Sequence, residues 1–161
     1  MTVQKSNIVT SFKNWGRELL IKFSFILNDW PPPNILTNLM RIKSETKLHG
    51  YGNRLPVVLF HKDKLIIRTD FKSINLHEFV NIDLELARDY QIEIEQKLSE
   101  DKIVCTVKSN NQIIDSLTVE EIKAVNFETV DVFISDNIQT SFGSYGRLHY
   151  VHIINKNFIG E

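Results

Sequence analysis

The strongest constraint on the fold of this chain is a two-residue alternation of apolar and polar side chains that recurs along most of its length. In residues 19–28, the side chains of Ile21, Phe23 and Phe25 fall on one side of an extended backbone. Lys22 and Ser24 fall on the other side. A period of two is typical of a half-buried strand. The segment is therefore predicted to form a strand with one face in a core.

The same alternation predicts about ten strands at short intervals, and only residues 119–125 have helical spacing. Strands that follow one another without intervening helices favour an antiparallel arrangement over a parallel α/β sheet. The predicted fold class is all-β, a two-sheet antiparallel jelly-roll sandwich, with residues 1–161 as a single domain. The strands are expected at residues 19–28, 35–43, 55–61, 64–70, 79–86, 90–98, 103–108, 113–117, 127–135 and 147–154.

Residues 79–98 are predicted to form an acidic hairpin that turns at residues 87–89. Symmetric closure would place Asp83 opposite Glu93, with Glu85 and Glu95 on the same exposed face. Like charges directly opposite each other destabilise a sheet. Three interpretations remain open: compensation by lysine or arginine on a flanking strand, a bound cation such as calcium, or a general acid/base pair. The four carboxylates are a weak cation candidate.

The composition excludes two classes of partner. The chain of 161 residues carries 19 basic and 20 acidic residues, a formal net charge of -1. Nucleic-acid binding normally requires a cationic patch, so no nucleic-acid partner is expected. No apolar run approaches the roughly 20 residues that span a bilayer, so no membrane insertion is expected.

Cysteine usage bears on the compartment. Cys105 is the only cysteine, so neither an internal disulfide nor a zinc ligand set is expected, and its place in an alternating run predicts a buried small hydrophobe. Residues 1–14 lack the apolar stretch of a signal peptide. We expect an extracellular location if the chain is part of a larger secreted protein, and a cytoplasmic one if it is the full chain.

Four sequence segments resemble the concanavalin-A-like, laminin-G-type jelly rolls. They read RLPVVLF and KLIIR at 54–68, YQIEIEQK and IVCTV at 90–107, VNFETVDVFISD at 125–136, and GRLHYVHI at 146–153. The resemblance covers residues 54–154, with 12–43 supplying the opening strands. It implies binding of glycans, heparin-like chains or protein partners, sometimes through calcium at the loop rim.

Galectins are the runner-up within this fold. Their sugar site resembles His-x-Asn-x-Arg followed by a tryptophan. Here His49, Asn53 and Arg54 supply the residue types at a different spacing, and both tryptophans, Trp15 and Trp30, lie upstream. The Glu-x-Asp-x-x-Glu pattern of glycosidases with this fold is absent, and so is a Gly-x-Ser-x-Gly nucleophile elbow.

Metal binding by histidine is not expected either. His149 and His152 are three residues apart on a predicted strand, so they point to opposite faces unless a bulge intervenes. His61 and His77 have no partner at a ligand spacing.

Loops at the rim of the sandwich are the predicted binding surface, because rigid scaffolds usually carry function on their loops. Three loops combine an aromatic ring with hydrogen-bonding groups suited to sugars. Turn geometry with an incidental aromatic is the alternative for each. The candidate ligand-binding residues are His49, Tyr51, Asn53 and Arg54 in the first loop, Trp30 in the second, and Tyr145, within residues 141–145, in the third.

These features predict a non-catalytic, lectin-like binding or adhesion module that recognises a glycan or a protein partner, and no enzyme activity. Two alternatives stay open. One is an assembly domain that self-associates or packs on neighbouring chains through a sheet face or an edge strand. The other is a small hydrolase on the same fold.

Overall fold

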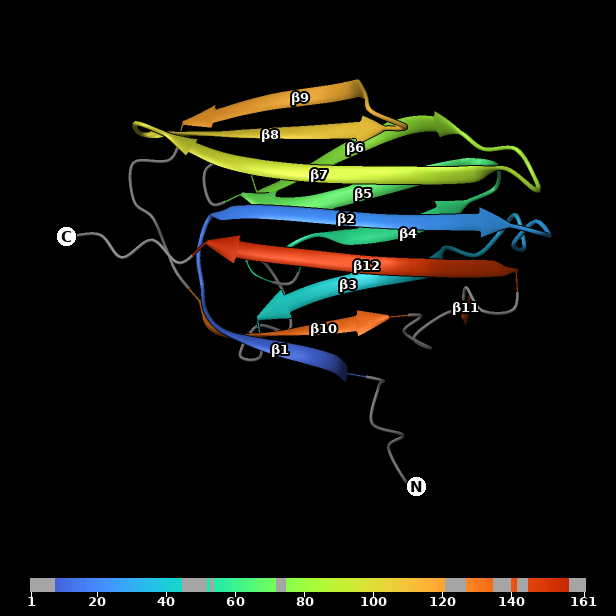
Figure 1. Ribbon diagram of the computed structural model, residues 1–161, viewed down its shortest axis with the longest axis horizontal. Coiled ribbons are helices and arrows are strands. Elements are labelled where there is room, and N and C mark those ends of the chain that lie inside the picture. The colour runs from blue at the N-terminus through green and yellow to red at the C-terminus, as the bar shows by residue number, and fades with distance from the viewer. Residues whose placement is uncertain are drawn as a thin grey trace.

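The computed structural model describes residues 8–44, 52, 54–71, 75–120, 127–134, 140–141 and 145–156. These residues form twelve strands in two sheets that pack face to face (Figure 1). The described residues contain no helix, and therefore none long and apolar enough to cross a membrane. The predicted all-β, two-sheet jelly-roll class is confirmed.

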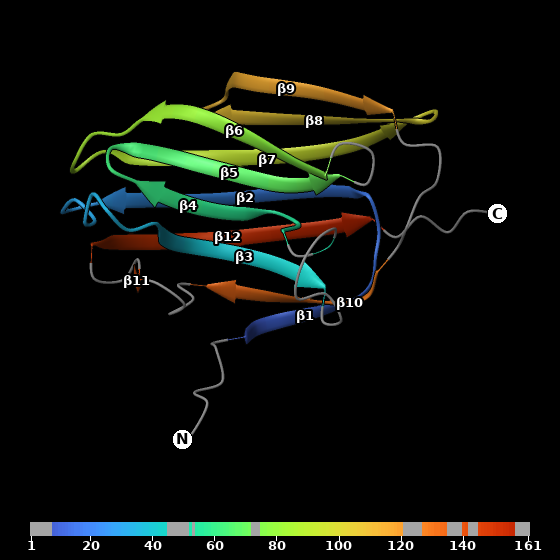
Figure 2. The same ribbon diagram turned by 180° about the vertical axis from the view of Figure 1, so that it is seen from behind.

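Figure 2 looks onto the larger sheet, which has seven strands. Neighbouring strands are antiparallel, except that the short β11 runs parallel to β3. In order across the sheet, the strands are β1 (Ile8–Trp15), β10 (Phe127–Ile134), β3 (Thr37–Ser44), β4 (Val57–His61), β5 (Lys64–Phe71) and β6 (Asn75–Asp83), with β11 (Thr140–Ser141) beside β3.

Figure 1 looks onto the smaller sheet, which has five antiparallel strands. Its long central strands largely alternate between a buried and a more exposed side chain; Ser24 of β2, buried between Phe23 and Phe25, is an exception. The strands, in order, are β12 (Gly146–Lys156), β2 (Glu18–Leu27), β7 (Asp89–Ser99), β8 (Lys102–Ser109) and β9 (Gln112–Glu120).

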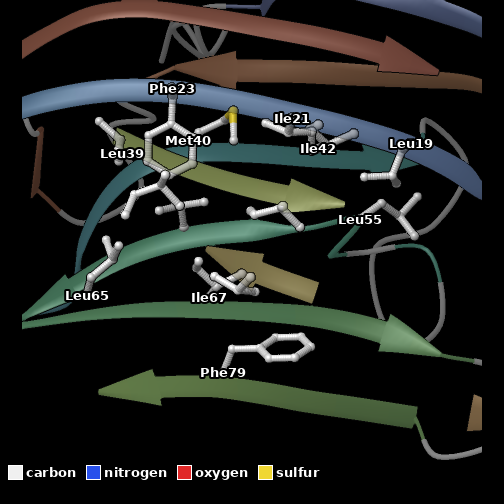
Figure 3. Close-up of a cluster of buried hydrophobic side chains, with 14 of the residues drawn as sticks. Leu19, Ile21, Phe23, Leu39, Met40, Ile42, Leu55, Leu65, Ile67 and Phe79 are labelled. Atoms are coloured by element: carbon white, nitrogen blue, oxygen red, sulfur yellow. The ribbon is translucent and has the colours of Figure 1, made fainter. Parts of the chain in front are cut away.

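The core lies between the two sheets (Figure 3). Phe25 of β2 meets Phe60 of β4 from the opposite sheet edge to face, with ring centroids 5.2 Å apart. It also stacks on Tyr90 of β7 at 5.5 Å. Burying one such ring stabilises a fold by about 1.5–3 kcal/mol, so the apolar half of the alternation supplies the main force that joins the sheets.

The predicted acidic hairpin at residues 79–98 is wrong. β6 and β7 lie in different sheets, and the connection between them crosses the sandwich. The Glu85 N–H donates to the Tyr90 hydroxyl at 2.8 Å, and the Ala87 N–H donates to the Leu27 carbonyl at 2.7 Å. Leu86, which continues the apolar phase of the strand expected at 79–86, is exposed. Two strands facing each other across one core have the same alternation as two paired strands, so the pattern alone could not separate the cases.

Other local expectations have mixed outcomes. Asparagine tolerates positive φ, so Asn110-Asn111 in the sequence predicts a tight turn. The structure confirms it: both residues have positive φ, 48° and 66°, as a two-residue hairpin turn requires. Residues 119–125 have helical spacing in the sequence, but β9 continues through Glu120, so the start of this segment is strand. Residues 121–125 lie outside the described part of the chain.

Besides the two-residue β11, one longer strand, β1, was not expected. Its side chains are mostly exposed, so it lacks the apolar alternation that marks the other strands. It is joined to β10 by its backbone ladder and by the Ser11 hydroxyl, which donates to Asp131 at 2.6 Å. The turn into β2 is fixed by Asn155, whose side-chain oxygen accepts the Gly16 N–H at 2.9 Å.

Candidate functional site

The side of the five-stranded sheet that faces away from the core carries a line of polar side chains across four strands. His152 on β12 pairs with Lys22 on β2, Lys22 pairs with Glu93 on β7, and Glu93 pairs with Lys108 on β8. Residues directly opposite in a sheet project to the same face. We call these four residues the cross-strand row, and the surface around them the outer face.

Glu93 is the centre of the cross-strand row. Its two carboxylate oxygens take separate partners, Lys22 Nζ at 3.1 Å and Lys108 Nζ at 3.2 Å. Partial burial raises the pKa of the Glu93 carboxyl, but the hydrogen bonds and positive charges of both lysines outweigh it, so the net shift is downward. Glu93 therefore stays ionised, and the row presents a carboxylate between two ammonium groups.

A bulge in β12 enlarges this polar surface. The register with β2 shifts between Leu148 and Tyr150, which inserts His149 as an extra residue. His149, Tyr150 and His152 are all exposed as a result. His149 and His152 were expected on opposite faces unless a bulge intervened; the bulge is present, and both side chains are exposed. His149 Nε2 lies 2.9 Å from an Asp89 carboxylate oxygen, and no third ligand-type side chain joins them among the described residues.

Next to the cross-strand row lies a shallow pocket of about 90 Å³. Its floor is formed by residues that lie side by side on neighbouring strands. Ile154 of β12 pairs with Leu20 of β2, and Leu20 pairs with Glu95 of β7. Apolar carbon and charged oxygen therefore occur side by side in one depression. The lining residues are Glu18, Leu19, Leu20, Glu95, Gln96, Lys97 and Ile154.

Two of the three predicted rim loops meet at one end of the sandwich. The backbone N–H groups of Asn28 and Asp29 both donate to the Tyr145 carbonyl, at 2.9 and 3.1 Å. Trp30 follows directly and keeps 39% of its surface exposed, while the Tyr145 ring packs partly against the core. β12 begins at the next residue, so this rim is continuous with the outer face.

Arg54, the described candidate residue of the first predicted loop, is not part of this site. Arg54 lies near the far end of β3, where the Leu55 N–H donates to the Ile42 carbonyl. Its guanidinium Nε donates to Asp70 at 2.8 Å, and the Asp70 side chain is 1% exposed. Arg54, just before β4, is thus tied to β5. The other three residues predicted there, His49, Tyr51 and Asn53, lie outside the described residues.

The four carboxylates of the weak cation candidate do not come together. Asp83 belongs to β6 of the larger sheet, where it pairs with Lys64. Glu85, in the crossover connection, is 3.5 Å from Arg88. Glu93 and Glu95 lie on β7 of the smaller sheet, each beside a lysine. Within the described residues, no group of three or more histidine, cysteine or acidic side chains could hold a metal.

Sequence reasoning missed the cross-strand row because its members come from four separate segments. Alternation predicts that Lys22 and Glu93 face solvent, but only the strand order and register bring them together. The signal available in the sequence was the in-phase spacing of polar residues on residues 19–28 and 90–98.

Comparison with family models and with curated proteins finds no match. Among the solved structures that match are several jelly-roll sandwiches. The pentraxin from Limulus polyphemus aligns with a TM-score of 0.59 at 9% identity, over 94% of this chain and 71% of its own. Alginate lyase A1-II′ aligns at 0.53 and 15%, over 89% of this chain and 65% of its own.

A third match is the binding domain of botulinum neurotoxin DC, solved in complex with SialylT. It aligns with a TM-score of 0.55 at 11% identity, over 86% of this chain and 32% of its own. The chain therefore spans less than two thirds of the length of the alginate lyase and about a third of the neurotoxin chain. These likenesses establish the concanavalin-A-like fold.

The expectation that the chain is not an enzyme is corrected by the same comparison. Several of the matching structures are alginate lyases, which are enzymes built on this fold. A jelly-roll sandwich without a known catalytic motif is therefore no argument against catalysis, because one fold hosts many chemistries.

Proposed function

We propose that this chain binds a carbohydrate on the outer face of its five-stranded sheet. The observation that carries the proposal is the cross-strand row of His152, Lys22, Glu93 and Lys108, which offers hydrogen-bond donors and acceptors side by side. Strands are about 4.8 Å apart, so the row extends over about 14 Å. That length suits an oligosaccharide better than a single sugar.

The side chains around the row support this proposal. Tyr150 lies two residues before His152 on β12, where it pairs with Ser24 of β2, and 45% of its surface is exposed. A tyrosine ring can stack on the C–H face of a sugar while its hydroxyl reaches a polar partner. The pocket floor of Leu20 and Ile154 offers a second apolar contact. Polar groups that fix orientation, set among apolar contacts, are typical of ligand sites.

The rim completes the proposed site. Trp30 and Tyr145 lie where β2 ends and β12 begins, so a branch of the saccharide that left the cross-strand row and followed these two strands would reach them. The matching neurotoxin domain, solved with SialylT, and an alginate lyase solved with its substrate are consistent with saccharide binding on this fold.

Glycan-array screening followed by calorimetry tests the proposal. We expect a hit whose affinity falls at least tenfold in Tyr150→Ala and in Lys22→Ala. The matched control is Lys64→Ala, which removes a lysine from a cross-strand ion pair on the other sheet. Affinity that is unchanged in both outer-face variants, or equally weakened by the control, would contradict the proposed site.

Cleavage of the bound saccharide is a second candidate function, favoured by one observation. The bulge in β12 exposes Tyr150 and His152 two residues apart on the same strand. Tyrosine and histidine are both side chains that act as general acids and bases. Mass spectrometry of the bound oligosaccharide should then reveal fragments that Tyr150→Phe and His152→Gln no longer produce.

A further inference from the structure

Among the side chains of the outer face that the structure describes, positive and negative charges are equal in number. Alternation and register direct ten described charged side chains outward on the five-stranded sheet, five of each sign. The described histidines there are His149 and His152. The basic side chains are Lys22, Lys97, Lys102, Lys108 and Arg147, and the acidic ones are Glu18, Asp89, Glu93, Glu95 and Glu120.

Most of these acids are already compensated. Glu93 has two lysines, Glu95 lies 3.1 Å from Lys97, and Asp89 lies 2.9 Å from His149. Surfaces that bind polyanions carry a surplus of lysine and arginine, which raises the local potential. An anionic sugar on this face would meet Glu93 and Glu95 and would have to compete with them for the same lysines.

An uncharged saccharide meets no such competition. Its hydroxyls donate to the remaining lone pairs of the carboxylates and accept from the remaining N–H groups of the lysines. Hydrogen bonds with one ionised partner are roughly twice as strong as neutral ones. The apolar floor of Leu20 and Ile154 suits the C–H face of the same ligand.

We infer that the ligand of the outer face is an uncharged oligosaccharide rather than an acidic one. This inference rests on the proposed function. The charge balance around Glu93 adds to that proposal the chemical class of the ligand, an uncharged oligosaccharide. Glu93 also determines the discrimination, because its removal would leave Lys22 and Lys108 as a surplus of positive charge.

Paired titrations at 20 and 500 mM salt test the inference, using neutral oligosaccharides and matched oligosaccharides that carry carboxylate or sulfate groups. We expect neutral ligands to bind at least tenfold more tightly than acidic ones, with less than a twofold change between the two salt concentrations. Tighter binding of the acidic series, with a fall of tenfold or more at high salt, would overturn the inference while leaving the proposed site intact. Failure of every saccharide would overturn both.

Glu93→Gln adds an independent arm. We expect it to weaken neutral binding several-fold and to create salt-sensitive binding of the acidic series. The matched control, Glu78→Gln, removes the carboxylate that pairs with Arg68 on the other sheet. It should change neither the affinity for neutral saccharides nor that for acidic ones. Unchanged selectivity in Glu93→Gln would contradict the role given to this carboxylate.

Discussion

At the scale of single residues, the environment of each titratable group decides what it can do. Cys105 and Glu93 illustrate the two extremes. Burial, with a smaller contribution from the Asp115 charge, raises the pKa of the Cys105 thiol to about 12. Glu93 is held ionised at the surface by two lysines. The sequence predicted the first environment from alternation alone, and the burial of Cys105 confirms it.

The Cys105 thiol should therefore be inert in the folded protein. Only the thiolate reacts with disulfide reagents, and at pH 8 a thiol with a pKa of about 12 is almost entirely protonated. We expect no labelling by a chromogenic disulfide reagent in native buffer and one equivalent in denaturant. Rapid labelling of the native protein would mean that β8 opens at Cys105 or is exposed there.

Glu93 should make stability depend on pH. Its folded-state pKa is below the unfolded value of about 4.3, so its contribution is present above that pH and is lost as the pH falls through the folded-state value. Glu93→Gln should therefore lower the free energy of unfolding at pH 7 by up to about 1 kcal/mol, because exposed pairs contribute little. At pH 3 the difference should shrink, as measured by urea titration at both pH values. An equal difference at both would contradict the ionic origin.

At the scale of elements, strand existence could be read from the sequence, whereas strand partners could not. Alternation located ten of the twelve strands of the described residues. It failed for β1, which is exposed, and for the two-residue β11. It also misassigned β6 and β7 as a hairpin. Strands of opposite sheets bury their apolar side chains in the same core, so their alternation looks the same as that of two paired strands. The register that assembles the cross-strand row depends on long-range packing, which no local pattern encodes.

The ion pair between Arg54 and Asp70 should matter more to stability than the exposed pairs do. The Asp70 carboxylate accepts both the Arg54 backbone N–H at 3.0 Å and its Nε–H at 2.8 Å, in a largely buried setting. Asp70→Asn should cost about 2–3 kcal/mol, as expected for hydrogen bonds to a buried charge. The matched control Glu78→Gln, at an exposed pair, should cost less than about 1 kcal/mol in the same denaturation experiment. Equal costs would contradict this structural role for Arg54.

At the scale of the whole molecule, the sandwich separates the inner sides of its two sheets, which hold the fold together, from the outer face of the smaller sheet, where we propose that the ligand binds. The buried halves of both sheets form one core, and the outer face of the smaller sheet gathers residues from β12, β2, β7 and β8. Of the predicted candidate residues, Trp30 and Tyr145 adjoin this face and Arg54 does not. The chain as a whole carries 19 basic and 20 acidic residues, and the described side chains of the outer face are balanced in the same way.

The most direct test of the central claim is an NMR titration with the saccharide found by array screening. Backbone and side-chain resonances of Lys22, Glu93, Lys108, Tyr150 and His152 should shift in a saturable way, with smaller shifts at Trp30. Resonances of β4 and β5 should stay unchanged. Shifts confined to the seven-stranded sheet or to the loop at Arg54, or no saturable shift at all, would contradict a carbohydrate site on the outer face.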